Sequence, residues 1–181
     1  LEDSFGWINQ TFDWDKLEKK PTLIPHQSSF PFEFAGNEET ALNVLNVLAP
    51  QYDLNPDDIE LEFYAEPPTE IATGGAFLPR VFLDQSAGED GRTLGEYWGV
   101  NDNGKFYVGL ETDVIRDPIK LIATLSHEIA HIKLLEDAGM EQVDEHLTDL
   151  VTVAYGVGIF GANASFQFKT NFDLWGYSGA G

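Results

Sequence analysis

Apolar and acidic residues alternate over residues 59–64, and this period of two is typical of a strand with one buried face. A second strand signal lies in residues 97–111, where two β-forming runs flank Asn103 and Gly104. Because an Asn-Gly pair suits a tight reversal, these residues predict a β-hairpin. Residues 76–83 are also mainly apolar and follow two glycines, so we expect a further strand there.

A period near 3.6 residues elsewhere predicts helices whose ends carry capping signals. The expected helices cover residues 37–49, residues 117–139 and residues 141–158. Asn37 and Asp117 are typical N-cap residues, and Pro118 suits the first helical position because the N–H it lacks has no partner there. Gly139 is expected to end the second helix. The pattern therefore predicts an α+β fold with a small β-sheet.

The length of 181 residues is that of one domain, residues 1–181, with three parts. Residues 1–36 are rich in aromatic residues and interrupted by prolines, so we expect an arm that packs on the body through its rings. This arm includes a short helix near residues 13–20 and a surface histidine, His26. Residues 37–111 are expected to hold a helix and the sheet, and residues 112–181 the metal-binding helices.

The composition is strongly acidic, with a formal net charge of −21 and only ten Lys and Arg residues. Such a surface repels nucleic acid and anionic membranes, so we expect neither as a partner. The absence of cysteine excludes disulfides and Cys-ligated zinc, and leaves His, Glu and Asp as ligands. No apolar run reaches the roughly 20 residues of a membrane span, and no signal peptide is recognisable, so we expect a cytoplasmic location.

The second expected helix contains the motif His127-Glu128-Ile-Ala-His131. Residues on an α-helix advance by about 100° each, so His127 and His131 lie about 40° apart on one face. This spacing suits two ligands of one tetrahedral Zn²⁺. Glu128 lies beside them, where a carboxylate can deprotonate a zinc-activated water. The three residues therefore predict the centre of a zinc hydrolase.

The rest of this helix carries apolar residues in nearly every direction, which predicts a buried helix. Buried imidazoles and carboxylates need partners, and a metal ion supplies them. The alternative is a helix in which His127 and His131 only form hydrogen bonds within the core.

The third expected helix brings further polar groups to the same level. Glu145 and Asp149 lie on one face of it with Thr148, Thr152 and Tyr155, opposite an apolar face. A short connection makes an αα-hairpin, so either carboxylate can reach the histidine pair, and the spacing does not choose between them. His146 points about 100° away from Glu145 and is a weaker ligand candidate. The alternative is an ordinary solvated face.

The motif followed by Glu145-x-x-x-Asp149 resembles the zincin metallopeptidases of the gluzincin type. The resemblance covers about residues 105–160 and implies zinc bound by His127, His131 and Glu145. It also implies Glu128 as general base and Asp149 as the partner that orients a ligand histidine. The interval from His131 to Glu145 is shorter than is usual in gluzincins, which leaves Asp149 as an alternative ligand, as in aspzincins.

The resemblance also implies a zincin-like fold, with a small sheet before the buried helix and residues 105–111 as the edge strand along the cleft. Tyr155, and more weakly His146, are candidates for stabilising an oxyanion, although a Tyr155 packed in the core is the alternative. The segments 147–150 and 158–163 are also similar to a family of bacterial proteins with this motif.

The expected function is that of a zinc metallopeptidase, a hydrolase that acts on a peptide or protein substrate with a zinc-activated water. One alternative is a metallopeptidase-like binding or regulatory module without turnover, which Glu128 argues against because a structural site needs no base. The other alternative is a zinc hydrolase of a non-peptide amide, and nothing in the sequence argues against it.

Overall fold

A computed structural model describes residues 2–65 and 94–166 of the chain. Within these residues the protein is a mixed α/β structure with six α-helices and a small three-stranded sheet. This combination of a small sheet and helices was expected from the sequence. The expected strand at residues 76–83 lies outside the described residues, as does the end of the chain beyond residue 166.

The sheet consists of β1 (Ile59–Tyr64), β2 (Gly95–Val100) and β3 (Phe106–Glu111), in the order β1-β3-β2. β1 runs parallel to β3, and β2 runs antiparallel to β3. The expected hairpin is confirmed: Asn101 N–H bonds to Lys105 O at 2.8 Å, and Gly104 adopts the positive φ of 77° that the reversal requires.

The prediction that residues 105–111 form an edge strand is wrong. These residues form β3, which pairs on both sides and lies in the centre of the sheet. In the sheet formed by the described residues, β2 is the edge strand that packs against the buried helix. The sequence missed this order because it depends on the parallel pairing of β1 with β3, which joins residues about 47 positions apart.

The buried helix is α4 (Pro118–Ile132), and it begins as predicted. The Asp117 carboxylate accepts hydrogen bonds from the N–H groups of Ile119 and Lys120. A π-helical turn, Lys133–Asp137, continues α4 before Gly139 ends it at a φ of 64°. The helix α3 (Glu38–Gln51) also begins as predicted, because the Asn37 side chain accepts from Thr40 N–H.

The third expected helix is shorter than predicted and is followed by another. α5 (Glu145–Ala154) begins four residues later than expected, because Asp144 acts as its N-cap. Gly156, with a φ of 77°, separates it from α6 (Gly158–Phe166). Glu145 is therefore the first residue of α5.

The arm is more helical than its composition predicted. It contains α1 (Glu2–Thr11), which was not predicted, and α2 (Trp14–Leu17), which confirms the short helix expected near residues 13–20. Its packing on the body is confirmed, since Ile8, Phe12 and Phe30 are buried in the common core.

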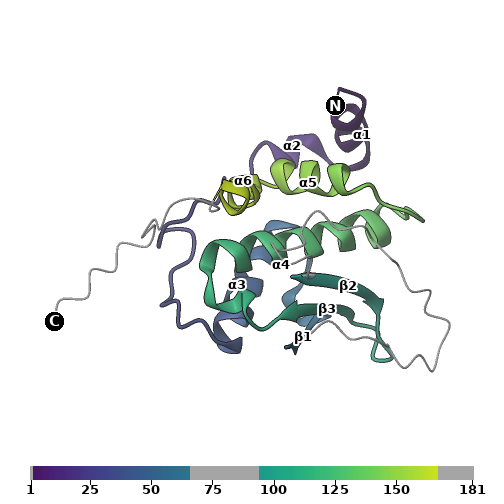
Figure 1. Cartoon of the computed structure of the whole chain (residues 1–181). Helices are drawn as coiled ribbons and strands as arrows, with labels where there is room; N and C mark the ends of the chain where they lie inside the picture. The colour runs from purple at the N-terminus through teal and green to yellow at the C-terminus, as the bar shows by residue number, and fades with distance from the viewer. Residues whose placement is uncertain (1, 66–93, 167–181) are drawn as a thin grey trace.

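The elements form layers around α4. The sheet lies on one side of α4, and α5 lies on the other side with α1 and α2 beyond it (Figure 1). α4 contacts β2, α3, α5 and α6, which explains why its apolar residues are buried in nearly every direction. Among the described residues, no helix is both long and apolar enough to cross a membrane.

Candidate metal centre

His127 and His131 lie one turn apart on the face of α4 that meets α5. Their Nε2 atoms are 3.2 Å apart, with the rings nearly perpendicular. α4 holds them in place because its first turn is capped and its apolar side chains are packed on several sides. The predicted spacing thus brings both imidazoles to one point.

Glu145 reaches the same point from the first turn of α5. Its Oε2 lies 2.9 Å from His127 Nε2 and 3.7 Å from His131 Nε2. Zinc bonds to nitrogen and oxygen are about 2.0–2.1 Å long, so two ligands of a tetrahedral zinc lie about 3.3 Å apart. The three separations of 2.9, 3.2 and 3.7 Å lie around this value.

Among the described residues, these three side chains form the group able to hold a metal ion, with ligand atoms within 4.8 Å of one another. The second carboxylate oxygen of Glu145, Oε1, is buried and has no hydrogen-bond partner. A buried carboxylate oxygen without a partner is unfavourable in a metal-free protein, whereas a metal ion would satisfy it. Two imidazoles and one carboxylate are also a donor set typical of catalytic zinc, so the residues present fit the ion.

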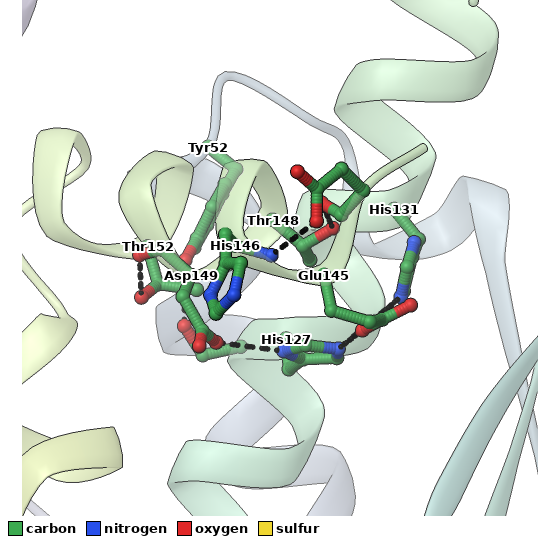
Figure 2. Close-up of polar contacts among 10 residues, drawn as sticks. Tyr52, His127, His131, Glu145, His146, Thr148, Asp149 and Thr152 are labelled. Atoms are coloured by element: carbon green, nitrogen blue, oxygen red, sulfur yellow. Dashed lines mark hydrogen bonds and ion pairs between the residues drawn. The ribbon is translucent and has the colours of Figure 1, made fainter. Parts of the chain in front are cut away.

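Asp149 lies on the opposite side of His127. Its Oδ1 is 3.2 Å from His127 Nδ1, whereas Glu145 meets Nε2 (Figure 2). The two carboxylates therefore occupy different positions. Glu145 belongs to the ligand cluster, and Asp149, with its side chain 69% exposed, fixes the orientation of the ring. A carboxylate on the second nitrogen of a ligand histidine is a common feature of zinc sites.

The cluster is strongly polarised in the absence of a metal. Burial by itself lowers the pKa of His127, but hydrogen bonds to Asp149 and Glu145 and the negative charge of Glu128 outweigh it and raise the pKa to about 10. Hydrogen bonds from His127 and His131 lower the pKa of Glu145 to about 2. His127 is thus an imidazolium at neutral pH, and a metal must displace its proton in order to bind.

The Glu128 side chain lies on the face of α4 that packs against the edge strand β2. Glu128 is only 3% exposed, and its Cγ packs beneath Gly95 of β2. Glu128 is close enough to the cluster for its charge to raise the pKa of His127. A buried carboxylate therefore lies near His127, one of the three candidate ligands.

The other candidates are not brought to the cluster. Tyr155 follows the last residue of α5, about 15 Å along the helix from Glu145 at 1.5 Å per residue. Its ring stacks on Tyr52 with centroids 4.6 Å apart, and the residue is 2% exposed, so its position favours the alternative of a core tyrosine. His146 and His26 are both exposed, as expected for His26.

Two features near the site were not found from the sequence. The hydroxyl groups of Tyr52 and Ser126 form a buried hydrogen bond of 2.5 Å, one residue before His127. This bond ties α4 to α3, and no local pattern indicates it because Tyr52 and Ser126 are 74 residues apart. The second feature is the close approach of Gly95, for which a glycine inside a strand pattern is a weak signal.

Comparison of the chain with protein-family models, with curated proteins and with solved structures gave no match in any of the three searches.

Proposed function

We propose that this protein is a zinc-dependent hydrolase, and that its substrate is a peptide bond. The observation that carries the proposal is the convergence of His127, His131 and Glu145 at separations suited to one tetrahedral zinc. A zinc ion in this position supplies a Lewis acid that polarises a carbonyl and makes water more acidic. The peptide bond is the substrate that the resemblance to zincins implies, and the zincin-like fold is part of the same proposal.

Each of the five residues at the proposed site has its own role in this reaction. His127, His131 and Glu145 hold the ion, and Asp149 keeps the Nε2 atom of His127 directed at it. Glu128 accepts a proton from the attacking water and passes it to the leaving amine. Its burial supports this role, because a carboxylate packed in the interior is held in one position.

The first experiment measures the metal. Protein purified without added zinc should contain close to one zinc per chain by elemental analysis, because three protein ligands leave the fourth position for water or substrate. His127→Ala and His131→Ala should lose it, whereas His146→Ala should keep it because His146 is exposed and outside the cluster. Zinc retained by both ligand variants would contradict the proposed site.

The second experiment measures turnover. A peptide library is incubated with the wild type and with Glu128→Gln, and cleavage is read by mass spectrometry. General base catalysis contributes about 10²–10⁴-fold, so the variant should lose at least about 10²-fold in rate while its zinc content and melting temperature stay nearly unchanged. Glu136→Gln is the control, because Glu136 is an exposed carboxylate just beyond the same helix, and its Oε1 accepts a hydrogen bond from Tyr97 OH and lies outside the candidate ligand cluster.

The outcomes separate the alternatives. A wild type that binds zinc and cuts no peptide favours a binding or regulatory module, or a hydrolase of a non-peptide amide. Equal cleavage by the wild type and Glu128→Gln would contradict the mechanism.

A further inference from the structure

The edge strand β2 begins at Gly95, which pairs with Leu110 of β3 and faces α4. A Cβ atom at this position would lie only 2.5 Å from Thr124 Cγ2, and 3.3 Å from both Glu128 Cγ and Leu110 Cδ2. Carbon atoms in ordinary contact are about 3.5–4.0 Å apart. β2 therefore approaches α4 to a distance that only glycine allows.

The two side chains of α4 under Gly95 have little freedom to move. Thr124 and Glu128 lie one turn apart on the same face of α4, and both are buried. Thr124 is β-branched and buried, so the surrounding side chains leave its methyl group little room to turn away. Glu128 Cγ is directly bonded to the carboxylate carbon. A displacement of Cγ is therefore passed on to the carboxylate.

We infer that Gly95 is a positioning residue for Glu128: its missing side chain lets β2 lie on α4 and fix the carboxylate beside the metal centre. The inference rests on the proposed function, since it gives Glu128 the role of the base. The ligands are affected less directly, because a Cβ at Gly95 would meet none of them among its nearest atoms, and they face α5. Gly95 should therefore matter for turnover more than for zinc binding.

The test compares Gly95→Ala with the wild type, both loaded with zinc, on a peptide identified as a substrate in the library. Misplacement of a catalytic group by about 1 Å can lower a rate about 10²-fold, so kcat should fall roughly 10- to 100-fold. KM and the dissociation constant for zinc should stay within about threefold of the wild-type values. The substitution displaces the base and removes no contact to the bound substrate or to the metal. A fall in zinc affinity that matches the fall in kcat would overturn the inference.

Gly109 provides a matched control in the same sheet. A Cβ on Gly109 would overlap the Trp98 ring, on the sheet face opposite Val108 and Leu110, whose side chains are buried in the core. Gly109→Ala should lower the melting temperature but leave kcat of the folded enzyme near the wild-type value. An equal loss of kcat in both variants would mean that any disturbance of the sheet affects turnover, and would overturn a specific role for Gly95.

A second pair of variants tests whether Gly95 acts through its neighbours. Thr124→Ser removes the methyl group of the closest overlap, so Gly95→Ala/Thr124→Ser should recover most of the lost kcat. In the Glu128→Gln background, Gly95→Ala should cost little further activity, since the group that it displaces no longer acts as a base. If Gly95→Ala lowers kcat by the same factor in the Glu128→Gln background as in the wild type, the inference is contradicted. It is also contradicted if Gly95→Ala/Thr124→Ser does not fold.

A readout that needs no substrate separates this inference from the proposed function. Overpacking of a well-packed interior lowers the melting temperature of a chain of this size by roughly 2–12 °C. In metal-free protein Gly95→Ala should lower the melting temperature by this amount. Adding Thr124→Ser or Glu128→Ala to the Gly95→Ala variant should make the loss smaller. If the wild type cuts no peptide but this coupling is found, the contact stands and the proposed hydrolysis fails. Absence of the coupling overturns the inference whether or not the protein is an enzyme.

Discussion

Glu145 and Asp149 both contact His127, but they meet different nitrogen atoms of its ring. The Nε2 side also carries His131, so a metal ligand on that side shares a site with a second imidazole. A carboxylate on Nδ1 can only orient the ring. The distinction between ligand and orienting residue therefore follows from which ring nitrogen each oxygen faces.

We expect Glu145→Ala to abolish stoichiometric zinc binding, because it removes one of three protein ligands. Asp149→Ala should weaken zinc affinity by only about 10- to 100-fold, which is typical of the loss of a residue that orients a ligand. Titration of the metal-free variants with zinc in the presence of a competing chelator measures both values. The reverse ranking would assign the third ligand to Asp149.

A second prediction concerns the pH dependence of metal-free protein. The pKa of His127 is raised from 6.5 to about 10, so its stabilising contribution is complete below pH 6.5 and is lost as the pH rises to about 10. The pKa of Glu145 is lowered from 4.5 to about 2, so its contribution is present above pH 4.5 and is lost as the pH falls toward 2. The cluster should therefore stabilise the fold most between pH 4.5 and 6.5.

Urea unfolding of chelator-treated protein at several pH values tests this prediction. The free energy of unfolding of the wild type should fall more steeply above pH 6.5 than that of Glu145→Gln, which has lost one of the charges that raise the pKa of His127. Asp149 and Glu128 still act on His127 in this variant, so its slope should be reduced rather than abolished. Identical slopes would show that the pair does not form in solution.

At the scale of single elements, α4 depends on its first turn as well as on its buried faces. The Asp117 carboxylate accepts two N–H groups of that turn, at 2.9 and 3.1 Å. Asp117→Ala should lower the free energy of unfolding by about 1 kcal/mol, as is typical for the loss of an N-cap. Chemical denaturation of metal-free protein measures it.

Asp113→Ala is the matched control for this change. Asp113 forms an exposed ion pair with Arg116 at 2.9 Å, only four residues before Asp117. Exposed pairs contribute little, so this variant should be much closer to the wild type. If the two variants lose the same stability, the cap does not hold the start of α4.

At the scale of the whole molecule, the helices of the N-terminal arm pack on the side of α5 that faces away from α4 (Figure 1). Phe12 meets the edge of the Tyr155 ring at 5.9 Å and lies 5.7 Å from the buried ammonium group of Lys133. Leu23 N–H also bonds to Gly156 O at 2.9 Å, so the arm is joined to the chain between α5 and α6. The arm is thus part of the core and not an appendage.

Phe12→Ala should therefore destabilise the whole fold by about 3–5 kcal/mol, as is typical of a buried phenylalanine. Phe12 is 8% exposed, whereas Trp14 in the same arm is 40% exposed, so Trp14→Ala should cause a clearly smaller loss. Urea unfolding followed by far-UV circular dichroism compares the two variants. A mild effect of Phe12→Ala would mean that the arm packs loosely.

The sequence by itself determined the features that depend on neighbouring residues. Asn37 and Asp117 specified where α3 and α4 begin, because a cap bonds to N–H groups two or three positions away. The alternation of residues 59–64 specified β1, and Asn103-Gly104 specified the hairpin. The spacing of His127 and His131 specified a shared face, because helical geometry is the same in every helix.

Only the tertiary structure decided the features that depend on distant contacts. The strand order required the parallel pairing of β1 with β3, and it moved the edge of the sheet from β3 to β2. The different roles of Glu145 and Asp149 required the position of α5 beside α4, since both carboxylates share one helical face. Tyr155 lies in the core because Tyr52, the residue that follows α3 and is about 100 positions away in the chain, stacks on its ring. Local patterns specify which face a residue occupies, whereas packing decides what that face meets.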